Sequence, residues 1–404
     1  MRPHAVPLPL CATSAALLSM ACMPLRSVPP QQLHTPAVEW SSFLLAADTL
    51  PVVQSGRAGW PITTSDPMVY ADAEGYHLFY STFFCQSGQG YAYSWDPANP
   101  ASCNIMTTVS SIGYAFSGDG GRNWEFRRAP VVMPADTGFD SGKIETASVF
   151  RLGDTLYIAY SADGDHGGRK LPARFQIGVA RLSLGARSVR TALMDESVQF
   201  QKNPRPLLPY DVSRGSFQNN VQEPSIIVRP DSVILYYIGL GLEQPTEPID
   251  AAGQGILSVG LGRAVFDTRL NLASRSASAL LSGVNITEVR YFGEAYHLFA
   301  TTLAGAEAHQ GEAISYARST DGLRWPTPRV ILAPGPKPGF NDWAVLGPTA
   351  VFGNSGLVVF YTALGTTTGP CVLLGPEGRF GIPIAGNSRC MFATIARAVP
   401  HPQP

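Results

Sequence analysis

Residues 66–82 read DPMVYADAEGYHLFYST and decide the fold. A short β-rich run, a turn that contains glycine and an aromatic-rich strand follow one another here, which is typical of a β-hairpin. The same phrase recurs four times, as ETASVFRLGDTLYIAYSA (145–162), EPSIIVRPDSVILYYIGLG (223–241), NITEVRYFGEAYHLFATT (285–302) and GPTAVFGNSGLVVFYTALG (347–365). The chain is therefore a fivefold repeat array.

Each repeat predicts a unit of four strands. After the hairpin, most repeats carry a third strand, as in Ile112–Ser117, and then a fourth strand that ends in a loop with proline or glycine, as in Arg329–Gly335. One such unit cannot bury both faces of its sheet, so the units must pack side by side. We expect an all-β chain whose residues 41–400 form a single domain, a five-bladed β-propeller of four-stranded antiparallel blades. We expect residues 42–50 to supply an outer strand that closes the ring.

The composition agrees with a globular β protein. Apolar residues make up 45% of the chain and charged residues 15%, which excludes a disordered or coiled-coil protein. The 40 glycines and 34 prolines predict frequent turns and few long helices. Because 29 basic residues balance 30 acidic ones, the chain offers no positive surface for a phosphate backbone, and nucleic acid is not an expected partner.

Residues 1–21 predict a signal peptide. Arg2 and His4 precede an apolar stretch from residue 8 to residue 21 that is too short, and too interrupted by proline, to span a bilayer. Ser19 and Ala21 supply the small side chains that signal peptidase requires before the cleaved bond. We therefore expect an exported protein that is secreted, periplasmic or held at the cell surface.

Cys22 follows the expected cleavage site, and residues 22–40, rich in proline and glutamine, resemble a tether. Lipidation of Cys22 would anchor the protein to a membrane, although Ser19 stands where a lipoprotein signal prefers leucine. Both anchoring and plain secretion stay open. No later apolar run is long enough to cross a bilayer.

The four remaining cysteines of the exported chain fall into two local pairs. Cys85 with Cys103 and Cys371 with Cys390 each enclose a loop-like segment, and an exported protein favours two disulfides that staple these loops. This pairing is one of three connectivities. The spacing fits no zinc site.

An acidic residue opens each of the first three repeats, namely Asp66, Glu145 and Glu223. An aromatic residue precedes each acid by six positions, in turn Trp60, Phe139 and Phe217. If these matched positions begin the innermost strands, the three acids converge on the propeller axis. Three neighbouring carboxylates are costly to desolvate, so a functional role is favoured over the alternative that each acid caps a strand.

The five-unit period and these acids resemble the five-bladed glycosidase superfold of glycoside hydrolase families 43, 32, 62 and 130. The resemblance to family 43 implies that Asp66 is the general base, Glu223 the general acid and Glu145 the residue that tunes the pKa of the acid, although family 43 has aspartate at the position of Glu145. The W-x-N-D-P-N-G and R-D-P phrases of family 32 are absent. The phosphorolytic family 130 would need basic phosphate ligands, for which the candidates by residue type are Lys143, Arg169, Lys170 and Arg290.

Three acidic side chains, those of Asp66, Glu145 and Glu223, suit hydrolysis of a glycosidic bond. This reaction needs one protonated carboxyl group at the leaving oxygen and one ionised carboxylate that activates water or attacks carbon. A third carboxylate raises the pKa of the acid and keeps it protonated near neutral pH. The resemblance to family 43 implies inversion and a substrate that contains arabinose or xylose, an oligo- or polysaccharide.

Other polar and aromatic residues are candidates for binding substrate near the acids. They are Trp60, His166, Asn220, Gln222, Glu288, His309, Asp342 and Trp343. For the aromatic residues, packing between blades is an equal alternative, and for Asn220 and Gln222 the alternative is capping of a loop. His77 and His297, each before Leu-Phe in a strand, are expected to be packed. We expect no required cofactor and a monomer; a central calcium ion stays open, without a readable ligand set.

Two phrases match or approach the Asp box, a turn of the form S-x-D-x-G-x-x-W. They are SGDGGRNW (117–124) and STDGLRW (319–325). We interpret them as turns in which the aspartate accepts backbone N–H groups and the tryptophan packs between sheets. Such boxes also occur in sialidases, but five repeats rather than six, and no Arg-Ile-Pro phrase, disfavour a sialidase. The alternative from another class is a carbohydrate-binding or surface-display propeller without catalysis.

Overall fold

The computed structural model describes residues 40–53, 63–87, 90–92, 109–164, 174–213, 215–243, 255–302, 310–353, 356–368, 372–373, 379–380, 382–383 and 389–401. All of them belong to one compact unit, residues 35–404. The expected signal peptide with Cys22, most of the tether, and Trp60, His166 and His309 lie outside the described residues. So do the side chains of the four cysteines expected to pair, so the disulfides stay predictions.

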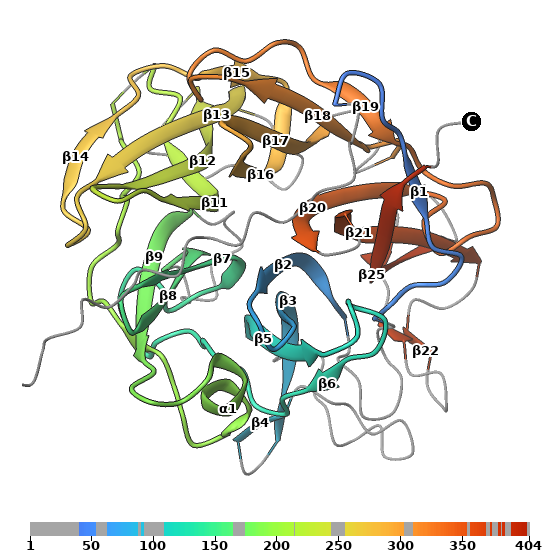
Figure 1. Ribbon diagram of the computed structural model, residues 1–404, viewed down its shortest axis with the longest axis horizontal. Coiled ribbons are helices and arrows are strands. Elements are labelled where there is room, and N and C mark those ends of the chain that lie inside the picture. Colours follow the sequence, from blue (N-terminus) through green and yellow to red (C-terminus); the bar gives the residue numbers. More distant parts are fainter. Residues whose placement is uncertain are drawn as a thin grey trace, which may run out of the picture. The chain divides into compact units, whose positions relative to one another are not determined.

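Five antiparallel sheets of four strands form the blades of a β-propeller, as predicted (Figure 1). Blade one consists of β2 (Ser65–Ala71), β3 (Tyr76–Ser87), β5 (Val109–Ser117) and β6 (Glu125–Phe126). Blade two consists of β7 (Ile144–Leu152), β8 (Thr155–Ala162), β9 (Gln176–Ser183) and β10 (Gln201–Lys202). Blade three consists of β11 (Asn220–Val228), β12 (Val233–Leu242), β13 (Ile256–Phe266) and β14 (Leu272–Arg275).

The last two blades follow the same order from the axis outward. Blade four consists of β16 (Val284–Phe292), β17 (Ala295–Thr302), β18 (Ala313–Ser319) and β19 (Arg329–Leu332). Blade five consists of β20 (Ala344–Gly353), β21 (Gly356–Thr368), β25 (Arg389–Pro400) and β1 (Leu45–Ala47). The short strands β4 (Gly90–Ala92), β15 (Leu281–Ser282) and β24 (Ile382–Pro383) extend blades one, three and five, while β22 (Val372–Leu373) and β23 (Arg379–Phe380) form a separate two-stranded sheet.

The ring closes by pairing the two ends of the described chain. Leu45 of β1 pairs with Pro400 of β25, so the N-terminal strand is the outermost strand of the last blade. The prediction that residues 42–50 close the ring is confirmed. The innermost strands β2, β7, β11, β16 and β20 each contact the next one around the axis, and β20 contacts β2 (Figure 1).

Apolar side chains fill each of the five interfaces between neighbouring blades. Representative buried pairs, in order around the ring, are Phe79 with Ile158, Ile177 with Leu235, Ile238 with Leu298, Phe299 with Val359, and Phe360 with Leu78. Phe43 and Leu45 join the interface of blades four and five. The core therefore lies between sheets, and each blade depends on its two neighbours.

The Asp boxes are structural turns, as expected. Asp119 Oδ1 accepts the backbone N–H groups of Arg122 and Asn123, both at 3.0 Å, and Trp124 packs edge-on against Phe360 of blade five. Desolvation raises the pKa of Asp119, but the hydrogen bonds from Asn123, Ser117 and Arg122 together outweigh it and lower this pKa to about 2. The second box repeats the arrangement on blade four, where Asp321 accepts two backbone N–H groups.

Helix α1 (Val189–Met194) begins at Ser188, whose side chain accepts the N–H of Thr191. Buried Arg127 of blade one fastens this segment by donating to the carbonyl groups of Leu193, Glu196 and Val198. Among the residues that the structure describes, no helix is long and apolar enough to cross a membrane.

Candidate active site

Every innermost strand contains a β-bulge at the same place, and the residue at the bulge has a left-handed backbone. The five bulge residues are Asp66 (φ 48°), Thr146 (φ 47°), Glu223 (φ 57°), Ile286 (φ 37°) and Gly347 (φ 58°). Positive φ is uncommon for residues other than glycine, and bulges often re-aim side chains beside active sites. The repeated strain therefore marks the axial end of these strands as a site.

The bulges surround a cavity on the propeller axis. Each blade contributes its bulge residue and the two residues that follow, from Asp66–Met68 in blade one to Gly347–Thr349 in blade five. The cavity holds about 30 Å³, room for roughly two water molecules. Asp66 and Glu223 line the cavity and Glu145 does not, while all three acids are partly exposed.

Hydroxyl groups of the preceding blade fix the bulges through their backbone N–H groups. The acceptors are Thr362 Oγ1 for Asp66 (2.7 Å), Ser81 Oγ for Thr146 (2.8 Å), Ser161 Oγ for Glu223 (2.8 Å) and Thr301 Oγ1 for Gly347 (3.0 Å). At the remaining interface, the register places Ile238, which has no hydroxyl group, at this position. These bonds offset the strain of the left-handed conformation.

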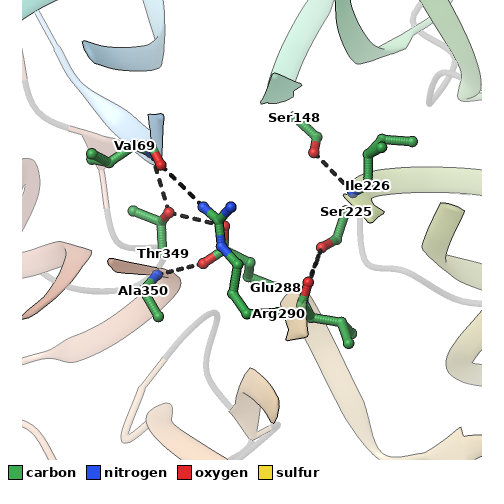
Figure 2. Close-up of polar contacts among 9 residues, drawn as sticks. Val69, Ser148, Ser225, Ile226, Glu288, Arg290, Thr349 and Ala350 are labelled. Carbon is green, nitrogen blue, oxygen red and sulfur yellow. Dashed lines mark hydrogen bonds and ion pairs between the residues drawn. The ribbon is translucent and has the colours of Figure 1, made fainter. Parts of the chain in front are cut away.

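A second ring of hydrogen bonds lies two residues further along each innermost strand (Figure 2). The side chain there accepts the N–H of the next blade, in the pairs Ser148 with Ile226 (2.9 Å), Ser225 with Val289 (2.8 Å), Thr349 with Val69 (3.2 Å) and Glu288 with Ala350. Met68 stands at this position in blade one. The axis is thus lined by a network that joins neighbouring blades.

The strand register corrects the sequence alignment of blade two. Glu145 pairs with Ser161 in the same way that Ser65 pairs with Ser81, one position before the bulge. Thr146, and not Glu145, is therefore the structural counterpart of Asp66 and Glu223. The interpretation that Glu145 is equivalent to these acids is wrong by one residue, because the left-handed turn falls on the threonine.

The three acids nevertheless share one electrostatic environment. Burial raises the pKa of Glu145 to about 7; the Asp66 carboxylate adds to this increase and the Lys143 ammonium group opposes it. Burial also raises the pKa of Glu223 well above its ordinary value, and the carboxylates of Asp66 and Glu145 raise it further. The convergence of all three acids on one substrate site stays a prediction, supported by these mutual effects on their pKa values.

Each carboxyl group at a bulge has a neighbouring hydroxyl donor. Ser65 Oγ donates to Asp66 Oδ2 at 2.9 Å. The Thr146 hydroxyl group hydrogen-bonds the Glu223 carboxyl group, which partly opposes the increase in the pKa of Glu223. The geometry thus places two carboxyl groups at one cavity, and the pKa of one of them, on Glu223, is raised well above its ordinary value.

Glu288, a candidate for substrate binding, lines the cavity, but its carboxylate is already engaged. It accepts the Thr349 hydroxyl group at 3.1 Å and the N–H of Ala350, and it forms an ion pair with Arg290. Arg290, a candidate phosphate ligand by residue type, also donates to the Val69 carbonyl at 3.0 Å (Figure 2). Both side chains therefore join blades four, five and one.

Asp342 and Trp343 are placed apart from the cavity lining. Asp342 is buried and accepts the N–H groups of Thr366 (2.8 Å) and Gly339 (3.3 Å), so it holds a loop. Trp343 is buried in an apolar cluster of blade five, with the Lys337 ammonium group 5.9 Å from its ring. Their roles in binding stay predictions.

The remaining candidates lie on or before β11 and β7. Asn220 is buried and Gln222 partly buried, and Gln222 stands one position before Glu223. Phe217 is buried and stacks on Tyr237, while Phe139 packs against the core between blades one and two, as in the packing alternative. His77 and His297 are buried and bond the hydroxyl groups of tyrosines, as expected for packed histidines.

Among the residues with described placement, no three His, Cys, Asp or Glu side chains form a group that could hold a metal ion. The sequence analysis did not identify the serine and threonine residues whose hydroxyl groups fix the bulges. A signal was present, since Tyr80-Ser81, Tyr160-Ser161 and Tyr361-Thr362 repeat an aromatic–hydroxyl pair at one place in the hairpin. Thr146 was missed because a threonine at a left-handed position is unusual.

No protein-family model matches this sequence, and no curated protein matches it either. Solved structures do match. A thermostable family 43 glycoside hydrolase superimposes with a TM-score of 0.52 at 13% identity, over 87% of this chain and 98% of its own. A family 117 glycoside hydrolase from the marine bacterium Zobellia galactanivorans superimposes with a TM-score of 0.53 at 16% identity, over 88% of this chain and 90% of its own.

The chain has the fold of the five-bladed glycoside hydrolases. A family 43 enzyme from Xanthomonas citri, with a TM-score of 0.50 and 14% identity over 88% of this chain and 90% of its own, has the same architecture. At these identities the likeness is one of fold. The activity must therefore be argued from the site.

Proposed function

We propose that this protein is a glycoside hydrolase in which Glu223 is the general acid, Asp66 the general base and Glu145 the residue that raises the pKa of Glu223. The observation that carries the proposal is the pair of acidic residues on matched bulges of blades one and three, both of which line one cavity. Such a pair with separated pKa values is what hydrolysis of a glycosidic bond requires.

In the proposed reaction, the Asp66 carboxylate takes a proton from water while the water oxygen bonds to the anomeric carbon. The bond between that carbon and the leaving oxygen breaks, and the proton of the Glu223 carboxyl group passes to the leaving oxygen. The product then has the inverted anomeric configuration. Burial and the neighbouring carboxylates support this division of roles, because they favour the protonated form of Glu223.

The cavity volume supports a substrate that binds over the cavity and not inside it. At about 30 Å³ the cavity admits water but no sugar ring, so the sugar would lie across the partly exposed Asp66 and Glu223. The family 43 enzyme of Xanthomonas citri has been solved with xylotriose. We propose a neutral oligo- or polysaccharide with arabinose or xylose as the substrate of this chain.

The proposal is tested with Glu223→Gln on a panel of aryl α-L-arabinofuranosides, aryl β-D-xylosides and fructans. We expect kcat/KM to fall at least about 100-fold on the substrate that the wild type cleaves. The melting temperature should hardly change, because the amide replaces a carboxyl group that is already neutral. Glu74→Gln, at the exposed hairpin turn of blade one, is the matched control and should keep full activity.

Two results would contradict the proposal. Loss of folding in Glu223→Gln would show that this acid is structural. Binding of glycans by the wild type without any turnover would indicate a carbohydrate-binding propeller instead.

A further inference from the structure

Blade two carries a hydroxyl group at the bulge position where blades one and three carry carboxyl groups. Ile286 and Gly347 occupy the bulges of blades four and five, so Thr146 is the third polar bulge residue of the ring. Its side chain is buried, and its own N–H is fixed by Ser81 Oγ at 2.8 Å. A buried threonine with a fixed backbone has few rotamers, which makes its hydroxyl group a rigid donor.

Thr146 and Ser161 form a closed hydrogen-bond ring with Glu223. Ser161 Oγ accepts the N–H of Glu223 at 2.8 Å and lies 2.5 Å from Thr146 Oγ1. Since Ser161 Oγ already accepts this N–H, its hydroxyl hydrogen is available for Thr146 Oγ1, and the hydrogen of Thr146 for the Glu223 carboxyl group. Two hydroxyl groups of blade two thus hold both the main chain and the side chain of one residue of blade three.

We propose that Thr146 is a positioning residue that orients the Glu223 carboxyl group, through the ring formed by Thr146, Ser161 and Glu223. The catalytic meaning of this role rests on the proposed function; the ring itself does not. The Thr146 hydroxyl group is neutral, so it restrains the acid without adding to the charge that Asp66 and Glu145 already place beside it.

The test uses the full chain with its glutamate side chains labelled with carbon-13 at the carboxyl position. The Glu223 signal is assigned by its loss in Glu223→Gln, and its titration is followed by NMR in the wild type and in Thr146→Val. A hydrogen bond donated to a carboxylate favours the ionised form. We therefore expect the pKa of Glu223 to rise in Thr146→Val and to return toward the wild-type value in Thr146→Ser.

The same variants are compared in steady-state kinetics. We expect kcat of Thr146→Val to fall roughly 10- to 100-fold with KM little changed, since a misoriented acid affects the chemical step. The alkaline fall of kcat/KM should move to higher pH, and Thr146→Ser should restore both properties. Thr146→Ala serves as a second variant should valine prevent folding.

Thr301→Val is the matched control, because Thr301 fixes the bulge at Gly347, where no carboxyl group is present. It should lower the melting temperature without moving the Glu223 titration. If Thr146→Val titrates like the wild type, the inference is wrong even when the wild type is active. If the pKa of Glu223 changes in Thr146→Val but the wild type cleaves no glycoside, the positioning role of Thr146 is supported and the proposed function is wrong.

Discussion

At the scale of single residues, the site depends on how three neighbouring carboxyl groups change one another's pKa. Glu145 titrates near pH 7 because of its burial and the nearby Asp66 carboxylate, and its ionised form in turn raises the pKa of Glu223. Glu223 must stay protonated to act as the acid. Activity should therefore fall as the pH rises through the pKa of Glu223, and Glu145 should set where that happens.

Glu145→Gln tests this dependence. Removing a like charge lowers the pKa of Glu223, so the alkaline fall of kcat/KM should move to lower pH, while kcat on the acid side of the optimum changes less than about threefold. The pH dependence of kcat/KM between pH 4 and 9 is the measurement. An unchanged alkaline limb would show that Glu145 does not act on the acid.

The same substitution should change stability with a defined sign. The pKa of Glu145 rises from 4.5 to about 7 on folding, so the folded protein binds the extra proton and stability is lost as the pH rises through that interval. Glu145→Gln should therefore be more stable than the wild type at pH 8, by about 1 to 3 kcal/mol, and nearly equal to it at pH 4.5. Urea unfolding at the two pH values measures the difference.

Individual residues also show where the sequence was sufficient and where it was not. Asp66 and Glu223 could be found because Asp-Pro and Glu-Pro open two clear repeats. In blade two, Glu-Thr-Ala offers the same acid one position early, and only the bulge geometry reveals that Thr146 takes the matched place. The hydrogen bonds that fix the bulges join residues that are 46 to 296 positions apart, such as Thr362 with Asp66, and no local pattern shows them.

At the scale of elements, a side-chain acceptor joins the innermost strand to the next one in blades two to five. Ser225 Oγ accepts the buried N–H of Val289 and donates to its carbonyl group, so one serine satisfies two groups of β16. The hairpins were predictable from alternating apolar and aromatic residues, since all five became the two innermost strands of a blade. The bulges were not predictable from the sequence, because they depend on hydrogen bonds between blades around the axis.

Ser225→Ala should weaken the contact between blades three and four. The N–H of Val289 would lose its acceptor in a buried place, which costs about 1 to 3 kcal/mol of unfolding free energy. The exposed Ser282→Ala, on β15, is the control and should change stability by less than about 0.5 kcal/mol. Equal stability of the two variants in urea unfolding would contradict a structural role for this network.

At the scale of the whole molecule, the propeller is held closed by β1. Phe43 and Leu45 are buried between blades four and five, and β1 covers the edge of β25. Arg397 of β25 also donates to both carboxylate oxygens of Asp48, directly after β1. This closure was predictable from the sequence because a fifth blade with three C-terminal strands needs a fourth strand from elsewhere.

A chain that begins at residue 50 should therefore be less stable than a chain that begins at residue 40. Loss of two buried apolar side chains and of the strand pairing should cost about 3 to 6 kcal/mol. The exposed edge of β25 should also promote association. Thermal unfolding and size-exclusion chromatography of both chains provide the measurement, and equal melting temperatures would show that β1 does not hold the ring.

The central claim is that Asp66 acts as the general base and Glu223 as the general acid. It is tested most directly by kcat/KM of Glu223→Gln and Asp66→Asn on two glycosides of one sugar, with nitrophenol or dinitrophenol as leaving group. Dinitrophenolate needs no proton to leave, so Glu223→Gln should recover most of its rate on that substrate, whereas Asp66→Asn should stay slow on both. An equal response of the two variants to the leaving group would contradict the account.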